Sequence, residues 1–308
     1  MDNSRRGMMY MLLAATGYSF FTIWVKVVQS AGMAPQDIAL WRFLLAAPLF
    51  WLALRLLRLP APERRLPRLK LLGVGTFIAV AALSAFTGLQ YLPASTFIVL
   101  FYTYPAMVAV LSALLGERLP LQGWAALGLT LVGVALTVPD FGEGVSENSW
   151  TGVALALFNA LVVATYYIVS GRVLRGYRAI NQVGAYTVTG ALLVFAALAP
   201  FRTVTAPPTW GAWGGILGLA TLSTVFPVFF LNRGIQQLGA ARAAILGMIE
   251  PMMTLIWAAL LLGERMELPQ IIGGGLILAS IVLLQLPLLL RGRPAASPLG
   301  EETYGGSS

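Results

Sequence analysis

Ten stretches of mostly apolar residues follow one another along this chain, each about as long as a membrane-crossing helix. The hydrocarbon core of a bilayer is about 30 Å thick, and about 20 helical residues span it. The short polar segments between the stretches leave too little water-facing surface for a soluble helical protein. The sequence therefore predicts an all-α integral membrane protein with ten transmembrane helices. The predicted spans are 7–29, 36–57, 68–90, 94–115, 121–139, 150–170, 179–200, 211–237, 240–262 and 269–290.

The second half of the chain repeats the first at an offset of 146 residues, with identical residues at matched positions. The identities include Gly88 with Gly234, Gln90 with Gln236, Ala94 with Ala240 and Pro105 with Pro251. A repeat of this length covers half of the protein, and a duplicated half is typical of membrane transporters. Five spans per unit is an odd number, so the second unit enters the membrane from the opposite side. The pattern predicts an inverted repeat about an axis in the membrane plane.

The repeat also sets the expected domain boundaries. We predict a first five-helix unit at 1–143, a second, inverted unit at 144–290, and a disordered polar tail at 291–308. The span 7–29 follows two arginines, as a cleaved signal peptide would. Its counterpart, 150–170, lies in the middle of the chain, so we interpret 7–29 as a mature helix.

The charge of the chain fits this topology better than it fits nucleic-acid binding. Apolar residues make up 58% of the sequence and charged residues 10%, and the net charge is +8. With the N-terminus inside, sixteen Arg and Lys residues fall on the inner side, and only Arg202 and Arg265 fall on the outer side. The positive-inside rule then predicts that both termini are cytoplasmic. The expected partner is the lipid bilayer, and no nucleic acid is expected.

Several classes of chemistry need residues that the sequence lacks. It has no cysteine and no histidine, which excludes disulfides, thiol nucleophiles, ordinary zinc sites and histidine acid–base catalysis. Neither lysine, Lys26 or Lys70, follows a glycine, so the chain has no phosphate-binding loop for ATP. We expect no cofactor, no metal and no enzymatic activity, and nothing implies an ATPase subunit. The sequence leaves open whether the protein is a monomer or a dimer.

Four short motifs resemble those of a known family. They are Trp41-Arg42-Phe43, Leu-Leu-Gly-Glu-Arg at both 114–118 and 261–265, Glu250-Pro251, and the glycines 273–275. With the two five-helix halves, they make the chain similar to the EamA type of the drug/metabolite transporter superfamily. The resemblance covers roughly residues 7–290, and within the superfamily the chain is most similar to amino-acid exporters of the YddG type.

This resemblance implies a fold and a location. The implied fold has a central cavity lined by the spans 7–29, 68–90, 94–115, 150–170, 211–237 and 240–262. The spans 121–139 and 269–290 are expected to pack behind them. The implied location is the bacterial inner membrane.

Prolines inside the spans mark the expected bending points. Pro105 and Pro251 occupy matched midspan positions of the two repeats, and each removes an amide donor and frees a carbonyl four residues back. Pro227 does the same to the carbonyl of Ser223. A proline can simply kink a helix, but two midplane prolines related by the repeat favour a functional role. We predict hinges at all three, with the freed carbonyls as candidate ligand acceptors.

Glu250 is the only acidic residue deep within a predicted span. A charge at that depth costs a few kcal/mol or more unless it is paired, protonated or solvated. Glu250 could bind a substrate ammonium group or carry a coupling proton. Its structural alternative is a protonated carboxyl that satisfies the backbone beside Pro251. The repeat counterpart of Glu250 is Tyr104, so the halves differ at this point.

Other polar and aromatic residues fall on the expected cavity helices. Midspan tyrosines suit an amphipathic cavity, and their rings can hold a cation. Helix packing is the alternative explanation for the small polar residues. The predicted cavity residues are Tyr18, Trp24, Ser84, Tyr102, Thr103, Tyr104, Asn159, Tyr166, Phe226, Phe230 and Glu250.

Two cations lie within spans near the outer side. We expect Lys26 to extend its amine to the interface, and Arg42 to pair with an outer carboxylate such as Asp37 or with helix ends. Attraction of a substrate carboxylate is the alternative for either cation.

The predicted function is secondary transport of small metabolites by alternating access. The resemblance narrows the substrates to amino acids, aromatic and other, with export as the direction. Transport is either facilitative or coupled to protons through Glu250. A drug efflux carrier and an organophosphate or nucleotide-sugar exchanger of the same superfamily are the alternatives. The exchanger is disfavoured because such substrates need several cations in the cavity. A membrane enzyme or a channel fits the sequence less well.

Overall fold

The structure of the protein is a computed structural model, in which the chain is helical. The residues it describes are 3–58, 67–88, 90–92, 94–117, 119–137, 150–174, 180–201, 203–262 and 268–290. These residues contain no strand, which confirms the predicted all-α class. The predicted tail at 291–308 and the junction between the repeats lie outside the described residues.

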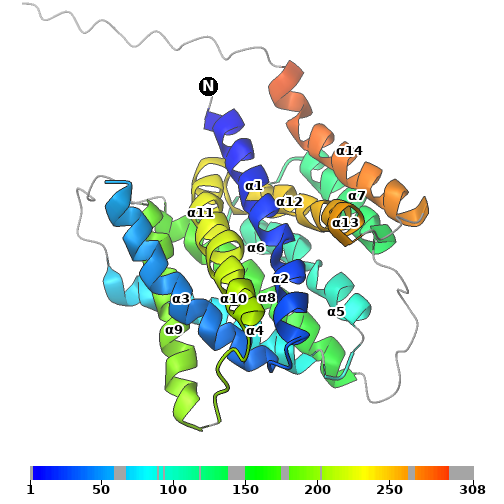
Figure 1. Ribbon diagram of the computed structural model, residues 1–308. Coiled ribbons are helices and arrows are strands. Elements are labelled where there is room, and N and C mark those ends of the chain that lie inside the picture. The colour runs from blue at the N-terminus through cyan, green and yellow to red at the C-terminus, as the bar shows by residue number, and fades with distance from the viewer. Residues whose placement is uncertain are drawn as a thin grey trace, which may run out of the picture.

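Helices occupy all the predicted spans, some of them in two pieces (Figure 1). The first half contains α1 (Asn3–Ser19), α2 (Phe21–Gln29), α3 (Pro35–Leu56), α4 (Arg68–Gly88), α5 (Ala94–Phe101), α6 (Tyr104–Leu114) and α7 (Leu121–Thr137). The second half contains α8 (Trp150–Leu174), α9 (Ile180–Leu198), η2 (Ala199–Phe201), α10 (Trp210–Ala220), η3 (Thr221–Val225), α11 (Phe226–Leu238), α12 (Ala240–Gly247), α13 (Ile249–Leu262) and α14 (Leu268–Leu290).

Membrane crossing is supported by the length and composition of these helices. Within the described residues, seven helical stretches are long and apolar enough to cross a bilayer. Shorter apolar helices occupy Leu121–Leu136 and Ile271–Leu283. The count of ten spans therefore stays a prediction, and so does the side of the membrane on which the termini lie.

Two of the broken spans are broken next to the matched prolines. Pro105 is the second residue of α6, where its missing N–H and fixed φ are tolerated. The preceding turn is satisfied locally, since both the amide and the hydroxyl of Thr103 donate to the carbonyl of Leu100, at 3.2 and 2.6 Å. Pro251 lies in the first turn of α13, directly after the turn at Met248.

The span that contains Pro227 is continuous but changes its winding. Between α10 and α11 the segment η3 is a π-helix, with the Phe226 amide donating to the Thr221 carbonyl. A π-helical turn leaves carbonyl groups short of ordinary partners and often marks a functional position.

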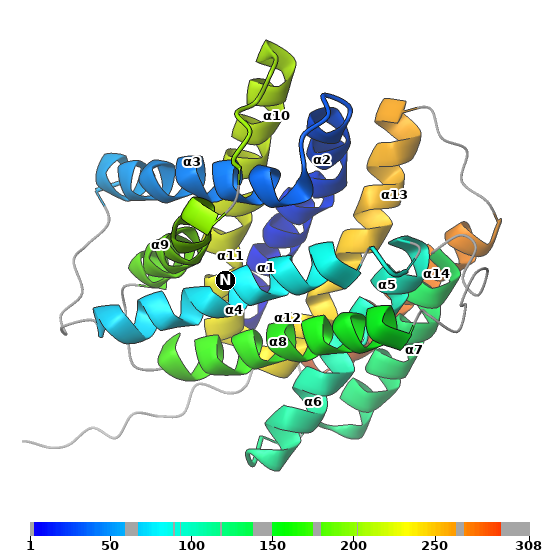
Figure 2. The ribbon, with the colours of Figure 1, turned by 90° about the horizontal axis from the view of Figure 1, so that it is seen from below.

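The helices pack in a pattern that separates a centre from an edge. In the centre α1 packs along α11, and α4 packs against both α8 and α9. Figures 1 and 2 show α7 and α14 side by side at one edge of the molecule, where the Thr130 hydroxyl donates to the Ser280 hydroxyl at 2.6 Å. The resemblance led us to expect this position for the two helices. The inverted relation of the halves remains a prediction.

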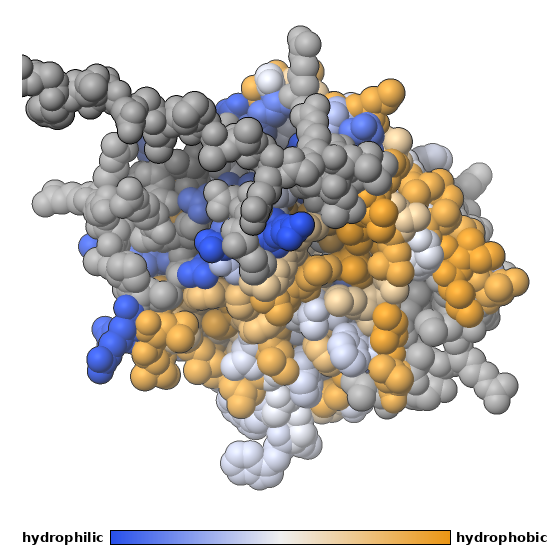
Figure 3. All heavy atoms as spheres, turned by 90° about the horizontal axis from the view of Figure 1, so that it is seen from above, coloured by the Kyte–Doolittle hydropathy of each residue, from blue (hydrophilic) through white to orange (hydrophobic). Residues whose placement is uncertain are grey.

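The surface exposes more large apolar side chains than a water-soluble protein would. Trp210 is 92% exposed, Phe201 86% and Leu69 85%. Contiguous exposed apolar surface marks contact with a membrane or a partner. Figure 3 looks onto the face where the chain begins, and shows hydrophilic groups on that face with broad apolar areas beside them. The fold is that of a multi-pass membrane protein.

Figure 1 places the start of α1 and the end of α14 on the same side of the molecule. We call this side the terminal face and the opposite side the distal face.

Backbone-to-backbone contact fixes the crossing of α4 and α9. Gly75 lies so close to α9 that a Cβ atom there would overlap the Thr187 carbonyl oxygen, and a Cβ at Gly190 would overlap that of Leu72. Small residues that let two backbones approach are a common basis of helix association in membranes. This crossing holds two cavity-lining helices at a fixed separation.

We expect Gly75→Val to destabilise the protein, because the added side chain forces α4 and α9 apart. Overpacking of this kind costs about 1–3 kcal/mol. Thermal unfolding of the purified protein in detergent should show a melting temperature several degrees lower. Gly73→Val is the matched control, since a Cβ at Gly73 meets no atom within 4 Å. Equal melting temperatures for the two variants would contradict this account of the crossing.

Candidate functional site

An open cavity of about 370 Å³ lies between the central helices. Its walls come from both halves of the chain, chiefly from α1, α4 and α8. Helices α3, α5 and α11 add two residues each, and α2, α6, α9, η3, α12 and α13 add one each. Ligand cavities in proteins typically measure about 300–1,000 Å³. The space is therefore large enough for a small metabolite.

The cavity occupies the middle and the distal half of the molecule. Helix α4 begins at the terminal face and contributes only later residues, from Phe77 to Ala85. Helix α8 runs the other way and contributes residues from Asn159 to Tyr167. The α4 residues lie in the half of that helix away from the terminal face, and the α8 residues lie near the middle of theirs.

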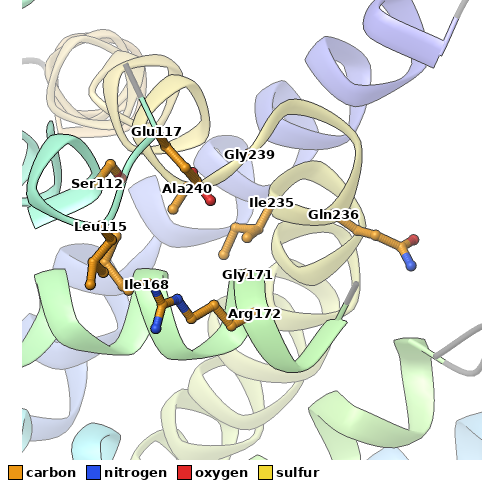
Figure 4. A pocket seen from close by; sticks show the side chains of 10 residues that line it. All are labelled: Ser112, Leu115, Glu117, Ile168, Gly171, Arg172, Ile235, Gln236, Gly239 and Ala240. Carbon is orange, nitrogen blue, oxygen red and sulfur yellow. The ribbon is translucent and has the colours of Figure 1, made fainter. Parts of the chain in front are cut away.

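The terminal half is packed. Gly234 lies against the Met11 side chain, and Gly7 lies against Leu238, so that α1 and α11 are in contact along this half. One pocket among the described residues there has a volume of about 30 Å³, close to that of one water molecule in the liquid. Figure 4 shows this pocket where α6, α8, α11 and α12 meet. The central cavity therefore lies away from this packed part of the terminal half.

Five of the predicted cavity residues lie on the cavity wall. They are Tyr18, Tyr104, Asn159, Tyr166 and Glu250. They come from α1, α6, α8 and α13, so both repeats supply polar groups to one space.

Glu250 reaches the cavity because α12 ends just before it. The break at Met248 places the carboxyl in the first turn of α13, where the helix dipole favours a negative group. The side chain is partly exposed, and among the described residues it has no hydrogen bond or ion pair. It lies close enough to Tyr18, Tyr104 and Tyr167 for electrostatic interaction.

The tyrosines beside Glu250 form a connected group. The rings of Tyr104 and Tyr167 pack together, with their centroids 5.5 Å apart. Both hydroxyls lie over Gly247, where a Cβ atom would be 3.3 and 3.4 Å from them. A glycine at this end of α12 leaves room for two hydroxyl groups at the floor of the cavity.

Asn159 joins two walls of the cavity. Its amide donates to the Ala81 carbonyl at 2.5 Å and to the Ser84 hydroxyl at 3.0 Å. Ser84 therefore lies behind Asn159 and acts as its support.

The other predicted residues lie off the wall. Tyr102 is buried against Phe101, and the Thr103 hydroxyl bonds within its own helix. Trp24 packs its indole over Gly218, and Phe226 and Phe230 pack on each other with centroids 4.9 Å apart. These residues face other helices or the outer surface because the rotation of each helix, which the sequence does not reveal, turns them there.

Arg42 is the main difference from the sequence-based expectation. Rather than Asp37, its partners are Thr224 and Ser223: Nε donates to Thr224 Oγ1 at 2.6 Å, and one terminal nitrogen donates to the Ser223 carbonyl at 2.9 Å. Asp37 accepts from the Thr205 amide at 3.2 Å. The carbonyl freed by Pro227 thus accepts from a protein side chain, although we expected a ligand there. Lys26 is exposed and does not line the cavity.

Sequence comparison identifies the family. The profile of the EamA-like transporter family matches the chain twice, over residues 5–138 and 150–286. The chain belongs to the EamA-like transporter family. This EamA-like transporter therefore takes a small-molecule substrate and is embedded in a membrane. Its class is that of transporters, which are not enzymes.

Individual relatives support this assignment. The EamA-like transporter is 28% identical over 278 residues to the uncharacterized transporter YcbK of Bacillus subtilis, covering 87% of this chain and 89% of the relative. An uncharacterized transporter of Synechocystis is 26% identical over 304 residues, covering 90% and 92%. The threonine/homoserine exporter RhtA of Escherichia coli is 28% identical over 224 residues, covering 71% of each chain.

A solved crystal structure has the same fold. It superposes with a TM-score of 0.78 at 16% sequence identity, covering 92% of this chain and 98% of the other. Identity at this level establishes the shared architecture alone.

Site-directed labelling can test the position of the cavity, because the chain has no native cysteine. We expect Ala82→Cys, on the cavity wall, to react with a water-soluble maleimide in the purified protein. Ala79→Cys, three residues earlier on α4 and fully buried, should react at least about tenfold more slowly. Labelling measured by mass shift gives the two rates. Equal rates would contradict the described cavity.

Proposed function

We propose that this EamA-like transporter exports amino acids, aromatic and other, and related small amphipathic metabolites across the bacterial inner membrane. Transport is secondary, without ATP, and works by alternating access. The observation that carries the proposal is the central cavity, whose mostly apolar walls hold one carboxyl group, that of Glu250, beside tyrosines. Similarity to the exporter RhtA supports amino acids as the substrate class.

The chemistry of the cavity suits an amphipathic amine. Glu250 can pair with an ammonium group, and the rings of Tyr18 and Tyr104 can add cation–π attraction. The apolar remainder, which includes Phe77 and Val163, favours an aliphatic or aromatic side chain.

The orientation of the protein in the membrane decides which side the cavity faces in this structure. The positive-inside prediction places the terminal face in the cytoplasm. The cavity then faces outward, and the state described here is the one from which an exporter releases substrate. The opposite state requires the packed terminal half to open.

The two alternatives within the superfamily need different cavities. Phosphate-bearing substrates require several cations, and among the described residues that line this cavity Arg42 is the only one. Drug efflux remains a second candidate, because the apolar walls and Glu250 would also bind a hydrophobic amine. Such a substrate has no need of Arg42.

Counterflow in proteoliposomes tests the proposal directly. Vesicles with the purified protein are loaded with one unlabelled amino acid at a time and diluted into the same labelled amino acid. Saturable accumulation of label for at least one amino acid is the expected result. No counterflow for any of them, with a monodisperse protein, would refute amino-acid transport.

We expect Glu250→Gln to reduce amino-acid counterflow at least about tenfold, because the amide cannot neutralise an ammonium group. Glu117→Gln, a change of the same type outside the central cavity, should retain counterflow. Counterflow needs no net proton movement. If Glu250→Gln keeps counterflow but loses stimulation of net flux by a pH gradient, Glu250 carries a coupling proton instead. If both are kept, the residue has neither role.

We also expect the matched prolines to act in turnover. Pro105→Ala and Pro251→Ala restore an amide donor at each helix break and should stiffen it. The turnover rate should fall several-fold while the half-saturating substrate concentration changes little. Pro48→Ala on α3, an exposed proline in a continuous helix, is the control. Wild-type turnover in both variants would exclude hinge bending at these prolines.

A further inference from the structure

Arg42 is held in a fixed position at the wall of the cavity. Its helix, α3, packs one face against α9 and α10 and exposes the other, with Leu44 41% and Leu52 50% exposed. The guanidinium is bonded to Thr224 and Ser223 and lies over the ring of Phe21, 4.9 Å from its centroid. A long side chain restrained on several sides has little conformational entropy to lose when it binds a ligand.

The bonds of Arg42 leave both donors and charge available. An arginine has five N–H donors, and two of them are used here. Both acceptors, a hydroxyl and a carbonyl, are neutral, so they satisfy hydrogen bonds but do not neutralise the cation. Cations within a membrane are costly unless an anion or water compensates them. Arg42 borders the open cavity, where a ligand can reach it.

Glu250 borders the same cavity from another side. Helix α1 packs against α13, which carries Glu250, and against η3, whose Ser223 and Thr224 bond to Arg42. Figure 2 shows α3 and α13 to either side of α1 and α2. Tyr18 of α1 lines the same cavity as the two charges. The cavity therefore has a cationic pole and an acidic pole.

We propose that Arg42 binds the carboxylate of the substrate while Glu250 binds its ammonium group, so that the cavity selects zwitterionic amino acids. The inference rests on the proposed amino-acid transport and adds Arg42 as the residue that binds the substrate carboxylate. A guanidinium is suited to this role because its planar fork matches two carboxylate oxygens. The apolar walls, which include Phe77 and Val163, would then contact the side chain of the substrate.

The selection follows from the cost of leaving one pole unpaired. An amine without a carboxylate displaces water from Arg42 and gives no anion in return. A carboxylic acid without an ammonium group does the same at Glu250. Hydrogen bonds to charged groups contribute enough that either analogue should bind at least about tenfold more weakly than the amino acid.

Competition in proteoliposomes tests the two poles separately. The probes are phenylalanine, phenethylamine, which lacks the carboxylate, and 3-phenylpropionate, which lacks the ammonium group. Each competes with counterflow of labelled phenylalanine, or with the amino acid that the screen selects and its matching analogues. With the wild-type protein, both analogues should compete at least about tenfold more weakly than the amino acid.

The variants should each lose one preference. In Arg42→Gln the amino acid and the amine should compete with counterflow almost equally well. The amino acid should still compete more strongly than the acid. In Glu250→Gln the reverse should hold. Arg233→Gln is the matched control, because Arg233 also lies over aromatic rings, 4.7 Å from the Phe229 centroid, but does not line the cavity. It should keep both preferences.

The outcomes separate this inference from the proposed function. If the wild-type protein carries no amino acid, the proposed function fails. If it carries amino acids but accepts the amine equally well, only the role of Arg42 fails. If Arg42→Gln weakens the binding of all three compounds by the same factor in a well-folded protein, Arg42 merely caps the Ser223 carbonyl, and the inference is overturned.

Discussion

A backbone carbonyl that loses its helical donor inside a membrane must find another partner, since no bulk water is there to supply one. This constraint shapes the centre of the protein. Pro227 denies a donor to the Ser223 carbonyl, and Arg42 of α3 provides it. The bond draws a cation from a peripheral helix to the wall of the central cavity. One missing N–H thus accounts for both the anchoring of α3 and the charge that the cavity presents.

The matched prolines meet the same constraint in another way. At Pro105 and Pro251 the helices end and begin again. The amides in the two turns donate to carbonyls of the helices that end there, Thr103 to Leu100 and Met248 to Ile245. Each restart brings the first turn of a new helix to the cavity, with Tyr104 in one half and Glu250 in the other. The two halves therefore share a backbone device but place different chemistry on it. That difference gives the cavity its acidic side chain, which comes from the second half alone.

Much of the fold could be predicted from the sequence, because spans, prolines and the repeat are local or periodic signals. Glu250 and Tyr104 could be found for a related reason: a carboxyl and its repeat counterpart next to midspan prolines are rare in hydrocarbon. The rest of the site could not be found so easily. In a soluble helix a polar face shows which side is buried, but a membrane helix is apolar all round and hides its rotation. Trp24 and Phe226 were placed on the cavity for lack of that signal, and they face elsewhere.

Arg42 shows a further limit of the sequence. Its role depends on a hydrogen bond to Ser223, 181 residues away along the chain. The sequence showed that the Ser223 carbonyl would be free and that Arg42 lay within a span, but not that the two would meet. A donor and an acceptor brought together by the fold leave no local pattern. Such a pair can be inferred only by asking where each unsatisfied group finds its partner.

The packing also indicates which contacts must change when the cavity opens to the terminal face during transport. Backbone contacts at Gly75 with α9, and at Gly133 with the Gly273 carbonyl, have no side chains that could rearrange. The terminal half is closed differently, by side chains such as Leu115, Ile168 and Ile235 around the pocket of Figure 4. Side-chain contacts can separate and hydrate without breaking a helix. We therefore infer that the glycine crossings stay intact during transport, and that the seam of α6 and α8 against α11 and α12 opens the path to the terminal face.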